Sequence, residues 1–119
     1  MDADAVKDRL AQEVDQRADV LLEMSHSIQE HPELCYEEHH AHDLLAGVLE
    51  DAGFDVQRGA GGMDTAFVAS AGDGDGPTIG VFCEYDALPE IGHACGHNVI
   101  GAAGLGAGLA AATVAEELG

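Results

Sequence analysis

A short stretch late in the chain, residues 84–98 (EYDALPEIGHACGHN), combines three carboxylates, two histidines and a cysteine. Within it, Cys95 and His97 are two residues apart. On a helix, two such side chains diverge by about 200°, whereas in an extended or looped backbone they point the same way. A thiolate and an imidazole together suit zinc or a similar borderline metal. We therefore expect a metal site only if this motif lies in a loop before a helix.

The Cys-x-His motif alone is a weak signal, because two ligands do not hold an ion. A loop that only packs explains Cys95 and His97 about equally well. Gly96, between them, allows the backbone to bend. The other two cysteines add no ligand: Cys83 lies in an apolar run and is interpreted as a small buried side chain, and Cys35 is given no role.

Hydrophobic patterns on the N-terminal side of the motif predict the elements that must position it. Apolar residues at helical spacing predict an amphipathic helix over residues 4–30, which ends before Pro32. A second stripe predicts a helix over residues 41–52, with Gly53 as its C-terminal cap. Strands are predicted for three short runs: FDVQR (54–58), TAFVAS (65–70) and TIGVFC (78–83).

After the motif, a last helix is predicted over residues 99–118, with Asn98 as its N-cap. The order helix, helix, strand, strand, strand, helix indicates an α/β fold in which helices pack on a twisted mixed sheet. The run GAAGLGAG (101–108) lacks the spacing of a phosphate-binding loop, so its glycines are interpreted as points where the helix lies close against the sheet. The side chains of His39, His40 and His42 are expected on the polar face of the second helix, solvated rather than bound to metal.

The charge balance limits the partners and the surroundings of the protein. Four Lys and Arg against 23 Asp and Glu give a net charge of −19, which argues against nucleic acid or an anionic membrane as partner. The acids are dispersed along the chain, as expected of adaptation to a high-salt cytosol; an ordinary acidic protein is the alternative. Three cysteines without disulfide spacing and an acidic, polar N-terminus predict a cytoplasmic location. The glycine-rich run 99–115 is short for a membrane span and is expected to be a buried helix.

The sequence around the motif resembles a known enzyme family. VFCEYDALPEIGHACGHN is similar to the amidohydrolase branch of the aminoacylase/glutamate-carboxypeptidase family of two-metal peptidases, and most of all to p-aminobenzoyl-glutamate hydrolases and related dipeptidases. HPELCYEEHHAHDLL and LEDAGFDV resemble the opening helices of that family. The resemblance therefore extends over nearly the whole chain, and the joint occurrence of D-A-L-P and H-A-C-G-H makes it specific.

The resemblance implies a role for each matching residue. It implies that Cys95 and His97 coordinate the metal, and that Asp86 is the active-site carboxylate that orients a ligand. Glu84 stands where other branches carry a histidine ligand, and we expect that it is not a ligand here. His93 is not a ligand in the family pattern and is left as a candidate for contact with substrate or with a ligating residue.

The chemistry that the resemblance implies is hydrolysis of the amide bond of an N-acyl amino acid or a dipeptide. A divalent metal, zinc or manganese, lowers the pKa of a water, and a glutamate acts as general base. In the family this glutamate, three further ligands and a lid domain, through which relatives often form homodimers, come later in the chain. Glu116 and Glu117 do not replace the base, because on one helix they lie about 28 Å beyond His97.

Residues 1–119 are therefore interpreted as the N-terminal part of such a catalytic domain, inactive by itself. The alternative is a non-catalytic domain that pairs with a separate chain or binds metal weakly. A nucleotide-binding module built on the glycine-rich helix is the least favoured interpretation.

Overall fold

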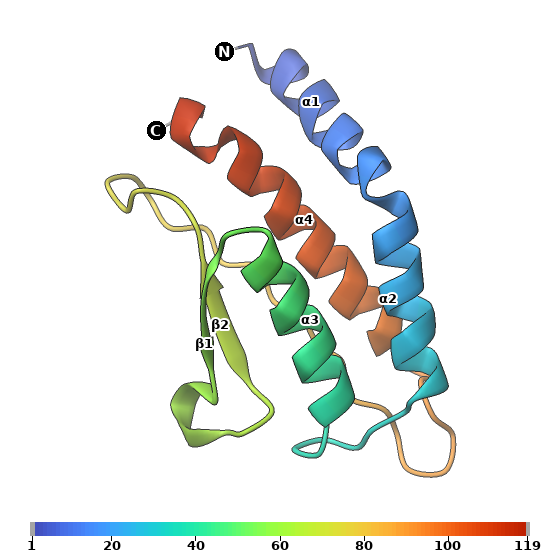
Figure 1. The fold of residues 1–119 in the computed structure, drawn as a ribbon. Coiled ribbons are helices and arrows are strands. Elements are labelled where there is room, and N and C mark those ends of the chain that lie inside the picture. Colours follow the sequence, from blue (N-terminus) through green and yellow to red (C-terminus); the bar gives the residue numbers. More distant parts are fainter. Residues whose placement is uncertain (1, 119) are drawn as a thin grey trace.

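The computed structural model describes residues 2–118, which form four α-helices, a short 3-10 turn and two strands (Figure 1). In chain order the elements are α1 (Ala3–Gln16), α2 (Ala18–Glu30), α3 (His39–Asp51), β1 (Asp55–Arg58), η1 (Ala60–Gly62), β2 (Phe67–Ser70) and α4 (His97–Leu118). Helices combine with a small sheet as in an α/β domain, which confirms the predicted class at that coarse level. Two details of the prediction are wrong.

The first error concerns the N-terminal helix, which is two helices and not one. The break is at Arg17, whose backbone (φ −101°, ψ 7°) departs from helical values. The Arg17 side chain donates to the carbonyl oxygen of Glu13 at 2.8 Å and to its carboxylate at 2.6 Å, so it satisfies the end of α1. A one-residue break hardly shifts the apolar spacing, so periodicity could not reveal it.

The predicted helix over residues 41–52 is confirmed as α3, which begins two residues earlier and ends one residue earlier. The expected glycine cap is also confirmed. Gly53 has φ 88°, and the N–H groups of Gly53 and Phe54 donate to the carbonyl oxygens of Glu50 and Leu49, each at 3.0 Å. This pair of bonds closes the helix in the way that a left-handed glycine allows.

The histidines of α3 differ from the expectation of solvated side chains. His42 is buried, lies edge-on to Phe67 with ring centroids 6.0 Å apart, and has its Nδ1 3.0 Å from an oxygen of Asp43. His40 is half-buried, with its Nε2 2.8 Å from the hydroxyl of Ser27. Only His39 is exposed. Helical position alone did not show that β2 packs against His42 and that α2 contacts His40.

The second error concerns the sheet. β1 and β2 pair antiparallel in the register Asp55↔Ser70 to Arg58↔Phe67, so two of the three predicted strands are confirmed. The third run, residues 78–83, forms no strand and makes no backbone hydrogen bond among the described residues. Ile79 and Phe82 are 86% and 88% exposed. The sheet is therefore a two-stranded antiparallel one, not the mixed sheet that was predicted.

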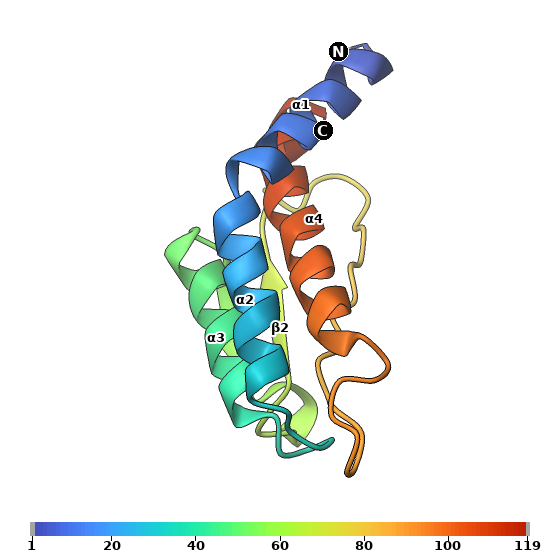
Figure 2. The same ribbon diagram turned by 90° about the vertical axis from the view of Figure 1, so that its right-hand side faces the viewer.

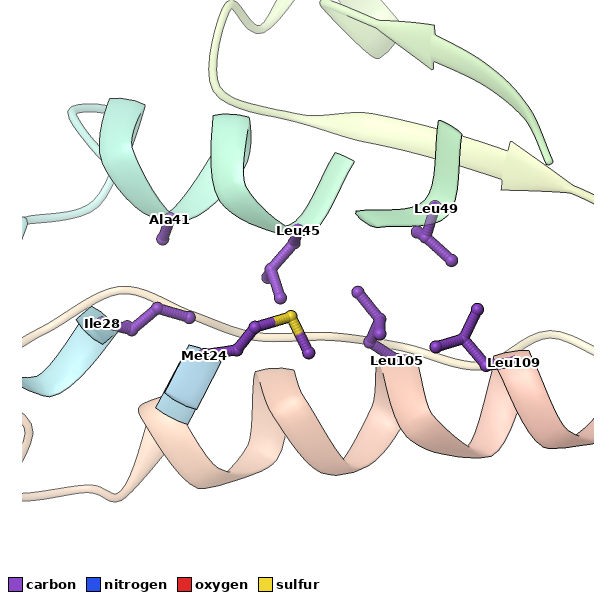
Figure 3. Close-up of a cluster of buried hydrophobic side chains, with 7 residues drawn as sticks. All are labelled: Met24, Ile28, Ala41, Leu45, Leu49, Leu105 and Leu109. Carbon is purple, nitrogen blue, oxygen red and sulfur yellow. The ribbon is translucent and has the colours of Figure 1, made fainter. Parts of the chain in front are cut away.

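The hydrophobic core lies between α2, α3 and α4. Figure 3 shows Leu45 and Leu49 of α3 facing Leu105 and Leu109 of α4. The full cluster comprises Met24, Ile28, Ala41, Leu45, Leu49, Leu105 and Leu109. Burial of one large aliphatic side chain contributes about 1.5–3 kcal/mol to folding. This cluster therefore fixes α4, which carries the candidate site at its N-terminus, against the other two helices.

Helix α4 contacts α1, α2 and α3, and Figure 2 shows the extended segment before it running alongside the helix. Among the described residues it is the single helix long and apolar enough to cross a membrane, by length and composition alone, and 44% of its most apolar window is buried inside the fold. The core helix of a water-soluble domain meets the same criterion. At its far end, Arg9 of α1 donates to the carboxylate of Glu117 at 2.6 Å.

Candidate metal centre

The H-A-C-G-H motif lies in a turn that leads directly into α4. The N–H of Gly96 donates to the carbonyl oxygen of His93 at 3.0 Å, and Gly96 has φ 76°, a conformation that favours glycine. Cys95 is within this turn and His97 is the first residue of α4. The two residues are therefore not within one continuous helix, which was the geometric condition for a metal site.

The expected N-cap role of Asn98 is wrong, because the helix begins one residue before it. Asn98 is the second residue of α4 and is 7% exposed. Its side-chain amide donates to the hydroxyl of Ser25 on α2 at 3.1 Å. Asn98 thus ties the start of α4 to α2 instead of capping its own helix.

Asp86 lies beside His97. An Asp86 carboxylate oxygen is 2.8 Å from Nδ1 of His97. A carboxylate only accepts hydrogen bonds, so Nδ1 carries the proton and donates it. In a neutral ring this leaves the lone pair on Nε2, the state in which an imidazole binds a metal. The role expected of Asp86, orienting a ligating histidine, fits this geometry.

Glu84 is the second carboxylate against the same ring. One of its oxygens is 3.2 Å from Nε2 of His97, within ion-pair distance. The His97 side chain is 19% exposed and that of Glu84 is 65% exposed, so this contact is at the solvent side of the ring. Sequence analysis placed Glu84 outside the ligand set, yet the structure places it next to the nitrogen that faces away from Asp86.

Cys95 and His93 stand apart from this arrangement. Cys95 is exposed, and the described residues hold no group of three or more His, Cys, Asp or Glu side chains arranged to hold a metal ion. Both ring nitrogens of His93 are buried without a hydrogen-bond partner among the described residues. Burial lowers the pKa of His93. The backbone of Ile28 lies near the ring and partly offsets this decrease, but it is not placed for a hydrogen bond.

The segment that carries the two carboxylates is held by Tyr85, which sequence analysis missed. Side chains alternate along an extended segment, so Tyr85 points away from His97 and packs against the core. Its hydroxyl donates to the carbonyl oxygen of Thr65, and its ring stacks on Phe67 with centroids 6.2 Å apart. Burial, followed by the nearby Glu38 carboxylate, raises the pKa of Tyr85 to about 12.

Two glutamates of the segment before α3 support the same region. The buried carboxylate of Glu38 accepts a hydrogen bond from the hydroxyl of Thr65 at 2.6 Å. The carbonyl oxygen of the same Thr65 accepts from the hydroxyl of Tyr85. The carbonyl oxygen of Glu33 accepts from the N–H of Ala87, next to Asp86, at 2.7 Å. The charge pattern of the sequence gave no signal for either role, because acids are spread along the whole chain.

Two glycines set how closely this segment approaches α4. A Cβ added at Gly101 would lie 3.2 Å from the carbonyl oxygen of Glu84, and one at Gly104 would lie 2.7 Å from Sγ of Cys83. Gly101 is one helical turn beyond His97, so the close approach brings the backbone of Glu84 to the face of α4 that bears the imidazole. The expectation that these glycines allow close packing is confirmed, although they pack on an extended segment and not on a paired strand.

Comparison with known proteins gives relatives over most of the chain, although no protein-family model matches it. The chain is 39% identical over 123 residues to the Xaa-Arg dipeptidase of Mus musculus, a match that covers 95% of this chain and 28% of that protein. It is 41% identical to the Xaa-Arg dipeptidase of Homo sapiens, over 87% of this chain and 27% of that protein. It is 37% identical to a p-aminobenzoyl-glutamate hydrolase polypeptide of Escherichia coli K12, over 82% of this chain and 24% of that protein.

These matches cover 82–95% of the chain. The chain belongs to the amidohydrolase and peptidase family of these relatives. It spans about a quarter of the length of the curated relatives that it matches, 24–28% of each.

Proposed function

We propose that this fold is part of a metal-dependent amidohydrolase that cleaves the amide bond of N-acyl amino acids or dipeptides. The observation that carries the proposal is the 2.8 Å contact between Asp86 and Nδ1 of His97. In a chain of this family, that contact prepares Nε2 of His97 to bind a divalent metal, zinc or manganese. Cys95, in the turn before the helix, is the proposed thiolate partner.

The described residues fit a metal by the chemistry of their donors. His97 offers an imidazole nitrogen and Cys95 a thiolate, both of which suit zinc. When bound, the metal supplies a water of lowered pKa. The part of Asp86 is to hold the His97 ring in one tautomer and one orientation. Tyr85 and the backbone of Glu33 hold Asp86 in turn, through the contacts to Thr65 and Ala87.

We further propose that the 119-residue chain alone does not catalyse hydrolysis. A hydrolytic site needs about three protein ligands, an open position for water and a general base within hydrogen-bond reach. The described residues do not gather three ligands. General-base assistance alone is typically worth about 10²- to 10⁴-fold in rate. Metal binding by this chain is therefore weak, and it depends on ionisation of Cys95, because the thiolate is the ligand.

The test compares this chain with a chain extended to the length of its relatives, in high salt with added Zn²⁺ or Mn²⁺. The substrates are N-acyl amino acids, p-aminobenzoyl-glutamate and a dipeptide series that includes C-terminal arginine. We expect turnover only by the longer chain, lost in its Cys95→Ala and His97→Ala variants. Metal-dependent turnover by the 119-residue chain, lost in Cys95→Ala, would contradict the proposal of an inactive part. Full activity of the longer His97→Ala variant would contradict the metal site.

A further inference from the structure

His97 lies between two carboxylates that contact it in different ways. Asp86 is 2.8 Å from Nδ1, the distance of a charge-assisted hydrogen bond. Glu84 is 3.2 Å from Nε2, which is ion-pair distance, but this contact does not meet hydrogen-bond geometry. When Nδ1 holds the single proton of a neutral ring, the Nε2 lone pair faces a carboxylate oxygen that also has only lone pairs. Two such acceptors repel each other unless a cation lies between them.

The separation of the two atoms fits two ligands of one metal ion. Zinc lies about 2.0–2.1 Å from a histidine nitrogen and about 2.0–2.2 Å from a carboxylate oxygen, in tetrahedral geometry. Two ligand atoms at these distances and at a tetrahedral angle are about 3.3 Å apart. The observed distance between Oε2 of Glu84 and Nε2 of His97 is 3.2 Å. A direct N–H···O bond between the same groups would be shorter, about 2.7–2.9 Å.

From these observations we propose that Glu84 is a metal ligand, and that it binds the same ion as Nε2 of His97. The expectation from sequence, that Glu84 does not coordinate, is replaced by this assignment. Glu84 and Asp86 are two residues apart on an extended segment and so share a face. Asp86 orients the imidazole through Nδ1, and Glu84 binds the metal ion that Nε2 of His97 binds.

The assignment adds one donor to the two ligands already proposed. With Cys95 of the adjoining turn, the chain carries three residues of ligand type, a carboxylate, an imidazole and a thiolate, but the described residues do not gather all three around one point. Glu84 is 65% exposed along its side chain, so an ion between it and His97 keeps positions open to water. An open position is what distinguishes a catalytic zinc site from a closed structural one. The inference rests on the proposed metal site and adds Glu84 to its proposed ligands.

The experiment measures Zn²⁺ affinity of the 119-residue chain in high salt, by competition with a chromophoric chelator, and follows Co²⁺ binding by its visible spectrum. Glu84→Gln keeps the shape of the side chain but removes its charge and its strength as a ligand. Glu90→Gln is the matched control, because it removes the same charge from the exposed loop before the motif. Glu84→His supplies a different zinc ligand at the same position.

We expect Glu84→Gln to weaken Zn²⁺ binding by about tenfold or more, by analogy with the 10- to 100-fold cost of losing even an outer-shell partner. Glu90→Gln should stay within about twofold of the parent chain. Glu84→His should restore binding to within a few-fold and shift the Co²⁺ spectrum, because an imidazole ligates the ion but cannot form an ion pair with a protonated His97. Thermal unfolding of each variant confirms that the fold is intact.

Four results would overturn the inference, and they separate it from the proposed function. Unchanged affinity in Glu84→Gln, with binding lost in His97→Ala, would remove Glu84 from the metal site and leave that site standing. Weakened binding in Glu84→Gln without recovery in Glu84→His would assign Glu84 an ion-pair role only. Absent binding by the parent chain, or unchanged binding in His97→Ala, would overturn the metal site itself and the Glu84 assignment with it.

Discussion

The close approach of the carboxylate-bearing segment to α4 can be tested at two glycines of the same helix. A Cβ added at Gly104 would lie 2.7 Å from Sγ of Cys83 and 3.0 Å from the carbonyl oxygen of Phe82, whereas one added at Gly108 would have no heavy atom within 4 Å. Both positions are half-buried and one helical turn apart. Gly104→Ala and Gly108→Ala therefore change helix propensity equally and differ in what the new methyl group meets.

The expected difference follows from these contacts. Replacing a helical glycine by alanine stabilises the helix by about 0.5–1 kcal/mol. Gly108→Ala should realise this gain in full. At Gly104 the same gain is opposed by overpacking, which costs about 1–3 kcal/mol when neighbours must shift. The Cys83 side chain can rotate, but the carbonyl of Phe82 is backbone and moves only with the segment. Gly104→Ala should therefore be less stable than Gly108→Ala by about 1–3 kcal/mol.

The assay is thermal unfolding of both variants and the parent chain in the same high-salt buffer. For a domain of this size, 1 kcal/mol shifts the midpoint by about 3–5 °C. We expect the midpoint of Gly108→Ala above that of the parent, and that of Gly104→Ala lower than Gly108→Ala by about 3–15 °C. Equal midpoints for the two variants would refute the close contact between α4 and residues 82–83.

Three further predictions concern the charge, a helix cap and a buried phenol. The four Lys and Arg side chains pair with only five carboxylates among the described residues, so the other carboxylates repel one another. The unfolding midpoint should therefore rise steeply between about 0.1 M and 2 M KCl, as the Debye length falls from about 10 Å to below 3 Å. A flat profile would contradict halophilic adaptation. The carboxylate of Glu33 accepts from the N–H groups of His40 and Ala41 at the start of α3, at 2.8 and 2.9 Å. Glu33→Ala should therefore lower the free energy of unfolding in urea by about 1 kcal/mol. Glu37→Ala, at an exposed position nearby, should leave it unchanged. Burial raises the pKa of Tyr85 from 10.0 to about 12, so the folded state favours the protonated phenol. The contribution of this group to the stability of the fold is complete below pH 10 and is lost as pH rises toward 12. The free energy of unfolding should therefore fall more over this window in the parent than in Tyr85→Phe, and equal profiles would show that the phenol is not buried.

The elements that the sequence predicted correctly are those determined by local patterns. The apolar stripe of α3 and its closing Gly53 are both properties of neighbouring residues, and both are confirmed. β1 and β2 were predictable for the same reason, because they pair with each other across a short connection. The break at Arg17 was not predictable, since it depends on the Arg17 side chain folding back onto Glu13, a contact that leaves the apolar spacing of the chain unchanged.

The third predicted strand shows the limit of local patterns. Residues 78–83 have a strand-like composition, but a strand exists only when a neighbour accepts and donates its backbone hydrogen bonds. Among the described residues this segment has no such neighbour, and the side of it that meets α4 contacts glycines instead. Composition therefore predicted an extended backbone correctly and predicted pairing wrongly.

At the candidate site, the same distinction separates what could be predicted from what could not. The family resemblance implied that Asp86 orients a metal ligand, and its 2.8 Å contact with Nδ1 of His97 fits that role. The position of Glu84 did not follow, because it depends on how far α4 approaches the extended segment, which is set by Gly101 and by the core beneath it. An extended segment without sheet hydrogen bonds can hold two carboxylates on one imidazole only if its opposite face is anchored. Tyr85 provides that anchor: the side chain between the two carboxylates is bound to the core, so the alternation of the backbone turns both of them toward His97.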